Sequence, residues 1–171
     1  VWDKSLQKNV CKVTGLSNSG KTKLSKNLDL VIPNQIDGKD VEVIGKNAFL
    51  ERDLSSTVKL TSVKLPNNLL KIEDSAFGGN ALKSVALPSK LRTIEQNAFC
   101  YNDISTLSIP NSVKEIGMNA FGGNSLGEVE IDNYKGLVKL DFQAFDSNVK
   151  IKYLRVKESF DINIKADNGV S

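Results

Sequence analysis

Residues 82–102 read LKSVALPSKLRTIEQNAFCYN, and residues 104–124 read ISTLSIPNSVKEIGMNAFGGN. Nine positions of the first stretch, from Leu82 to Asn102, carry the same kind of residue 22 places later. A fixed period between about 20 and 50 residues is typical of solenoids, in which each unit is stable only when it is stacked on its neighbours. The sequence therefore predicts a repeat protein.

The same order of residues extends in both directions. An earlier copy begins at Leu60, and a later copy begins at Leu126 with two extra residues between Ile131 and Leu137. A stretched first copy, around Leu30, precedes them. An alanine-phenylalanine pair punctuates every copy, and its phenylalanines are Phe49, Phe77, Phe99, Phe121 and Phe145.

Each position of the unit has a predicted physical role. Aliphatic residues from Leu82 to Leu87 suit a half-buried strand, and Pro88 ends that strand because proline lacks a backbone N–H group. A short helical or irregular turn follows, in which Phe99 fills the interior of the coil. An asparagine after each turn can bond loop backbone groups that would otherwise be buried without partners. These asparagines are Asn80, Asn102, Asn124 and Asn148.

Composition excludes several functional classes. The chain has 171 residues, of which 40% are hydrophobic, so one domain with a continuous core is expected. A net charge of +3 without a basic, aromatic-rich stripe argues against nucleic-acid binding. The chain has no histidine, and Cys11 and Cys100 are too far apart in sequence for a metal-type pair. We therefore expect no enzyme activity, no cofactor and no metal.

The two ends of the chain do not follow the repeat. Residues 1–32 are predicted to form an N-terminal cap, in which a strand near residues 10–14 forms a β-hairpin with a returning strand at residues 24–32. A solenoid needs such an end because its first coil would otherwise expose an apolar face. Residues 33–156 are predicted to form the solenoid, and residues 157–171 either a C-terminal cap or a linker to a following domain.

Gly15–Thr22 matches the phosphate-binding pattern GxxxxGK[ST]. That motif works between a buried parallel strand and a helix, and neither is indicated by the flanking residues. Only ten residues separate Thr22 from Pro33, and the rest of the chain follows the repeat. A turn in the N-terminal cap is therefore preferred, and nucleotide binding is the least favoured function. No apolar run is long enough to span a membrane, so no direct membrane insertion is expected.

Outward positions of the stacked strands are the predicted ligand-binding surface. The candidates are Lys64, Ser84, Thr106, Ser108, Glu128, Glu130, Tyr153 and Arg155. The last two follow from placing a further unit at Ile151, Leu154 and Val156. The central hydroxyl groups suit hydrogen bonds to an extended peptide or glycan, and the charged end suits a basic partner. The alternative is that Glu130 and Arg155 neutralise each other on an ordinary solvent-facing surface.

The unit LxxVxLPxxLxxIxxxAFxxNxL resembles the BspA-like leucine-rich repeats of bacterial surface proteins. The opening unit is also similar, since an Ile44-Gly45 step precedes its Ala48-Phe49 pair. The resemblance covers about residues 28–156. It implies an α/β repeat protein: a curved, right-handed, strand-rich leucine-rich-repeat solenoid with units of about 22 residues.

The resemblance also implies a function. Such a protein is secreted or displayed on a bacterial cell surface and attaches to host or neighbouring-cell macromolecules. The leading prediction is therefore a non-enzymatic recognition module that binds a protein or glycan partner through its concave strand face. The alternative is a structural spacer that presents another domain.

Overall fold

The computed structural model describes residues 2–3, 8–9, 11–16, 29–54, 58–131, 136–141 and 143–153. Only the backbone is described for residues 2–3, 8–9 and 153. The strands are β1 (Trp2–Asp3), β2 (Lys8–Asn9), β3 (Cys11–Val13), β4 (Asp29–Val31), β5 (Gln35–Ile36), β6 (Lys39–Ile44), β7 (Ser62–Lys64), β8 (Lys71–Ile72), β9 (Thr93–Ile94), β10 (Leu107–Ile109), β11 (Glu115–Ile116), β12 (Glu128–Ile131), β13 (Lys139–Leu140) and β14 (Lys150–Tyr153).

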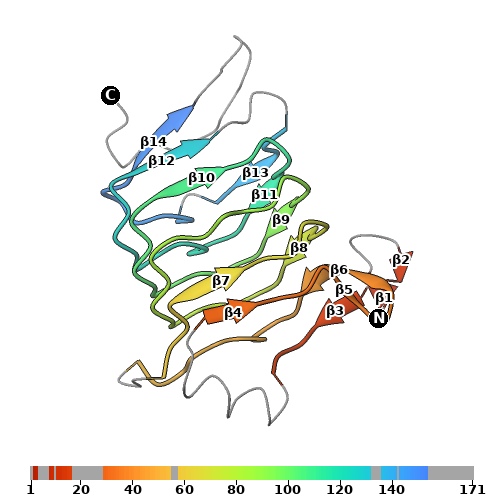
Figure 1. Cartoon of the computed structure of the whole chain (residues 1–171). Coiled ribbons are helices and arrows are strands. Elements are labelled where there is room, and N and C mark those ends of the chain that lie inside the picture. The colour runs from red at the N-terminus through yellow and green to blue at the C-terminus, as the bar shows by residue number, and fades with distance from the viewer. Residues whose placement is uncertain are drawn as a thin grey trace.

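The strands form two parallel ladders on two sides of one coiled chain (Figure 1). The front ladder consists of β4 with β7, the bridge between Ser84 and Thr106, and β10, β12 and β14. The return ladder runs in the order β3, β6, β8, β9, β11 and β13, with β5 added to β6 as an antiparallel strand. The turns that lead from the return ladder back to the front ladder make up a third side, the turn edge. These parallel ladders agree with the predicted strand-rich solenoid.

The register of the ladders follows the sequence repeat. In the front ladder Leu107 pairs with Val129, 22 residues later, and Val129 pairs with Ile151 at the same spacing. In the return ladder Glu115 pairs with Lys139, 24 residues later. The two extra residues of this coil are therefore recovered before β14, in the link that follows the last turn, so both ladders keep their parallel pairing.

The phenylalanine rings form one stack through the interior. Ring centroids of successive phenylalanines are 5.2, 5.2, 5.4 and 5.5 Å apart from Phe49 to Phe145, and neighbouring ring planes differ by at most 12°. Phe77, Phe99 and Phe121 are fully buried. Stacked rings bury large apolar surfaces and prefer centroid distances of about 4.5–7 Å. The predicted alignment of the phenylalanines is confirmed.

The buried asparagines tie each coil to the one before it. The Asn102 Nδ2 group donates to the carbonyl oxygens of Phe99, at 3.1 Å, and of Phe77 in the preceding coil, at 2.9 Å. Its Oδ1 atom accepts from the Leu82 N–H group at 3.1 Å. Asn80 and Asn124 repeat this pattern. The structural role predicted for these three is confirmed, whereas the prediction is wrong for Asn148, which is exposed.

The turns are irregular and not helical. The residue before the alanine-phenylalanine pair has a left-handed backbone in four coils, with φ of 55–56° at Asn47, Ser75, Asn97 and Asn119. Asparagine adopts this conformation more readily than most residues, so a helix is interrupted before it can begin. Every regular element in the described residues is a strand. The α/β class is therefore wrong for this part of the chain, which is a strand-based repeat.

The described strands of the N-terminal region do not pair as predicted. β3 pairs with β6 and β4 pairs with β7, both in parallel, so the hairpin between the two segments is wrong. The physical reason is that the two strands lie on different sides of the coil, and each extends a ladder of the repeat. An antiparallel pair does occur further upstream, between β1 and β2. The capping role of residues 1–32 and the handedness of the coil stay predictions.

In the described part of the chain, no helix has the length and hydrophobicity needed to span a bilayer.

The asparagine contacts predict a large difference between two equivalent positions. Asn102→Ala is expected to lower the free energy of unfolding by about 2–3 kcal/mol, because it leaves buried backbone groups without hydrogen-bond partners. Asn148→Ala, at the exposed end of the same column, is expected to change it by less than about 0.5 kcal/mol. Urea denaturation measures both values. Equal losses would show that the buried asparagine bonds do not hold the coils together.

Candidate functional site

The front ladder presents two rows of outward side chains. One row runs from Asp29 through Ser62, Ser84, Thr106 and Glu128 to Lys150. The other runs from Val31 through Lys64, Ala86, Ser108 and Glu130 to Lys152. The rows alternate with the buried core positions, because successive residues of a strand point to opposite faces. The sequence prediction of an outward-facing surface on these strands therefore holds as far as β12.

Six of the eight predicted site residues share this face. Lys64, Ser84, Thr106, Ser108 and Glu128 are exposed, and Glu130 is half-buried. The placement of Tyr153 is wrong, because it pairs with Ile131 in a row that is buried in the preceding coils. Arg155 lies outside the described residues. The error arose because the two extra residues were assumed to shift every later position, whereas the chain recovers them before β14.

Charges at the carboxyl-terminal end of the front ladder are paired with each other. The Lys152 ammonium group lies 3.4 Å from a Glu130 carboxylate oxygen and 3.9 Å from one of Glu128. This is the predicted neutralisation of Glu130, with Lys152 in the place that was expected for Arg155. Such exposed ion pairs contribute little stability, but they reduce the net charge that this end offers to a partner.

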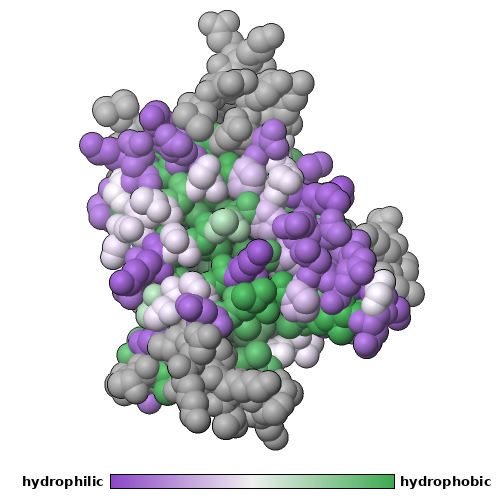
Figure 2. All heavy atoms as spheres, viewed as in Figure 1, coloured by the Kyte–Doolittle hydropathy of each residue, from purple (hydrophilic) through white to green (hydrophobic). Residues whose placement is uncertain are grey.

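The centre of the front ladder is a shallow floor of small side chains. We call this set the hydroxyl floor, and its members are Ser84, Ala86, Thr106 and Ser108, all of them exposed. Figure 2 shows pale, weakly polar side chains on the side of β7 and β10, and strongly hydrophilic ones over β8, β9 and β11. The floor carries no charge, and its hydroxyl groups can both donate and accept hydrogen bonds.

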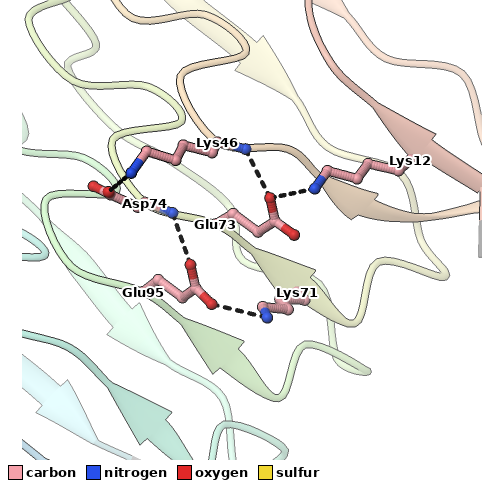
Figure 3. Close-up of polar contacts among 6 residues, drawn as sticks. All are labelled: Lys12, Lys46, Lys71, Glu73, Asp74 and Glu95. Atoms are coloured by element: carbon pink, nitrogen blue, oxygen red, sulfur yellow. Dashed lines mark hydrogen bonds and ion pairs between the residues drawn. The ribbon is translucent and has the colours of Figure 1, made fainter. Parts of the chain in front are cut away.

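The hydrophilic side of the return ladder contains a network of ion pairs (Figure 3). Lys12 pairs with Glu73, Lys46 pairs with Asp74 at 2.8 Å, and Lys71 pairs with Glu95 at 2.8 Å. Glu73 and Glu95 also accept the backbone N–H groups of Lys46 and Asp74 respectively. Each carboxylate therefore holds the turn of the preceding coil, so the network is structural.

Asp74 titrates differently in the folded chain. Burial of the carboxyl group is the largest influence on its pKa and opposes ionisation, but side-chain hydrogen bonds, first of all from Lys46, outweigh it. The pKa of Asp74 therefore lies below its ordinary value of 3.8. The same hydrogen bond raises the pKa of the Lys46 ammonium group above 10.5.

The phosphate-binding pattern has a structural explanation at its first residue. Gly15 has a φ of 138°, and a Cβ atom there would lie 2.8 Å from the Ala48 carbonyl oxygen. Glycine is therefore required for the close approach of two coils. Residues 17–22 of the pattern lie outside the described residues, so the preference for a turn over a nucleotide site stays a prediction.

No catalytic or metal-binding cluster is found among the described residues. These residues contain no group of three acidic or cysteine side chains placed to hold a metal ion. Cys11 and Cys100 are both free thiols. Burial raises the pKa of the Cys100 thiol, which keeps it protonated and a poor nucleophile at neutral pH.

The turn edge carries exposed apolar residues that sequence reasoning missed. Tyr101 is 57% exposed and Met118 is 44% exposed. Beside Met118 lies a depression of 490 Å³ whose lining includes Gln143 and Asp146. The available signal was the sequence AFCYN in one unit where the units on both sides have AFGGN. A glycine replaced by an exposed tyrosine is not needed for the core.

Comparison with protein-family models matches residues 42–166 to the BspA type leucine rich repeat region, in six copies. Neither the curated proteins nor the solved structures contain a match to the chain.

The Asp74 contact predicts a specific acid response. Since its folded pKa is lowered, its stabilisation is complete above the ordinary value of 3.8 and is lost as pH falls through the lowered pKa. Asp74→Asn is therefore expected to lose less stability than the parent chain between about pH 6 and about pH 2.5. Urea midpoints across that range measure it, with the exposed Asp103→Asn as control. Identical pH profiles for all three chains would contradict the proposed contact.

Proposed function

Because this chain belongs to the BspA type leucine-rich repeat family, we propose that it is a recognition module without catalytic activity that binds an extracellular macromolecule through its front ladder. The BspA-like repeat is a protein-interaction module, which supports the general part of this proposal. Attachment to a protein or glycan of a host or neighbouring cell is the finer part. A location on the bacterial surface or in the surrounding medium goes with it.

The hydroxyl floor is the observation that carries the proposal. Its side chains are short, so a partner can approach the strands closely along Ser84 and Thr106, which are bridged to each other. Short side chains also lose little conformational entropy when a ligand orders them. An extended peptide or a glycan, which offers many hydrogen-bonding groups along its length, fits such a surface best.

The charges around the floor favour hydrogen bonding over electrostatic attraction. Lys64 lies on the amino-terminal side of the floor, and Glu128 and Glu130 lie on the other side. The two glutamates are already paired with Lys152. We therefore expect the binding to depend weakly on ionic strength, because few unpaired charges take part.

The spacer function is the second candidate, and the neutralised end of the front ladder favours it. A rigid stack with internally paired charges is suited to holding another domain at a distance. In either case we propose the same organisation, with residues 1–32 as the cap, residues 33–156 as the solenoid and residues 157–171 as a closing segment or linker.

Arginine substitutions in the floor distinguish recognition from spacing. Ser84→Arg combined with Thr106→Arg is expected to reduce binding of the labelled protein to intact epithelial and bacterial cells at least about tenfold, because two long charged side chains cover the floor. Flow cytometry measures the binding. Ser89→Arg combined with Asn111→Arg adds the same charge at two exposed positions of the same coils, outside the front strands, and is expected to retain it.

Two outcomes contradict this proposal. If the floor variant and the control variant bind equally well, the floor is not the contact surface and the spacer function is favoured. If the unmodified chain binds neither kind of cell, it does not act as an adhesive module.

A further inference from the structure

Tyr101 has a backbone conformation that its side chain disfavours. Its φ is 52°, and the equivalent residues of the neighbouring coils are Gly79 and Gly123, with φ of 74° and 68°. A bulky residue in the left-handed region costs of the order of 1 kcal/mol, and such strain is typical of functional positions. More than half of the Tyr101 surface is exposed, so burial in the core does not offset this cost.

The tyrosine ring and a carboxylate meet at one glycine. A Cβ atom on Gly123 would lie 2.6 Å from Cδ1 of Tyr101, so the ring rests directly on this residue. The Gly123 N–H group donates to both carboxylate oxygens of Asp146, at 3.0 and 3.1 Å. These bonds hold the carboxylate in place beside the ring.

The carboxylate also borders the depression on the turn edge. Asp146 is the one charged residue among those that line it, and Met118 supplies an exposed apolar surface. The Asn97 and Asn119 side chains of the lining are bonded to each other at 2.9 Å, which fixes their orientation. Gln143 adds a further exposed amide. The lining therefore offers carbonyl oxygens and a negative charge next to flat or soft apolar groups.

The charge at this place has no partner within the chain. In the described residues neither Asp146 nor the exposed Asp103, two positions after Tyr101, forms an ion pair. An aromatic ring beside an unpaired carboxylate attracts a cation, through the ring face and through the charge together. Among cationic side chains arginine fits best, because its planar guanidinium group stacks on apolar surfaces and donates several hydrogen bonds at once.

We propose that the turn edge around Tyr101 and Asp146 binds an arginine side chain of a protein partner. The guanidinium group would contact the Asp146 carboxylate and the depression, with Tyr101 covering its approach. This surface is separate from the hydroxyl floor, so it is a second contact site and does not depend on the front-ladder proposal.

Titration with a short peptide tests the site. The probe is acetyl-Gly-Arg-Gly-amide, and the control is the same peptide with citrulline, which has nearly the same shape but no charge. Amide chemical shifts of the ¹⁵N-labelled chain are expected to change saturably around residues 101, 118, 123 and 146 with the arginine peptide. The citrulline peptide is expected to bind at least roughly fivefold more weakly.

Three variants of the chain locate the contact. Asp146→Asn keeps an oxygen for the Gly123 N–H group but removes the charge, and is expected to weaken binding roughly fivefold or more. Tyr101→Asn removes the ring while keeping a residue that tolerates the left-handed backbone, and is expected to weaken binding roughly threefold. Glu130→Gln removes a charge from the front ladder and is expected to leave binding unchanged. Thermal melting of each variant verifies that it is folded.

The proposal is overturned if the two peptides bind equally or if no shift changes saturate. It is also overturned if the shifts map to the front ladder, or if Asp146→Asn binds as well as the parent chain while remaining folded.

Discussion

Every coil of this protein depends on the stacking of its turn onto the turn of the next coil. The phenylalanine rings repeat at 5.2–5.5 Å, and the asparagine amides join backbone groups of successive coils. A turn with a left-handed residue cannot satisfy its own carbonyl groups as a helix would, so the neighbouring coil must supply the partners. The short strands follow from this constraint, because the turns already hold the coils in register.

Division of labour between buried and exposed columns explains where function can lie. The buried columns hold the fold, so outward positions are free to vary without loss of stability. The front ladder uses that freedom for short hydroxyl side chains at its centre and for paired charges at its carboxyl-terminal end. The turn edge uses it differently: Tyr101 replaces a glycine at some cost in strain. That substitution makes the turn edge chemically distinct from the other two sides.

Much of the fold could be predicted from sequence, because the buried columns are periodic. The phenylalanine stack, the asparagine contacts of three coils and the outward rows as far as β12 were all accessible in this way. The last coil was not, since a sequence pattern cannot show that an insertion after Ile131 is compensated before Ile151. The pairing of β3 and β4 was missed because both lie in stretches that deviate from the repeat. Tyr101 was missed because its significance lies in a backbone angle.

The central claim is that the coils are held as one cooperative stack through their turns. Hydrogen exchange of the backbone amides in a Phe99→Ala variant tests it most directly. If the claim is correct, protection is lost at the Phe77 and Phe121 amides of the neighbouring coils as well as at residue 99, because the first two bond across the stack. Loss of protection confined to the substituted coil, with both neighbours unchanged, would contradict it.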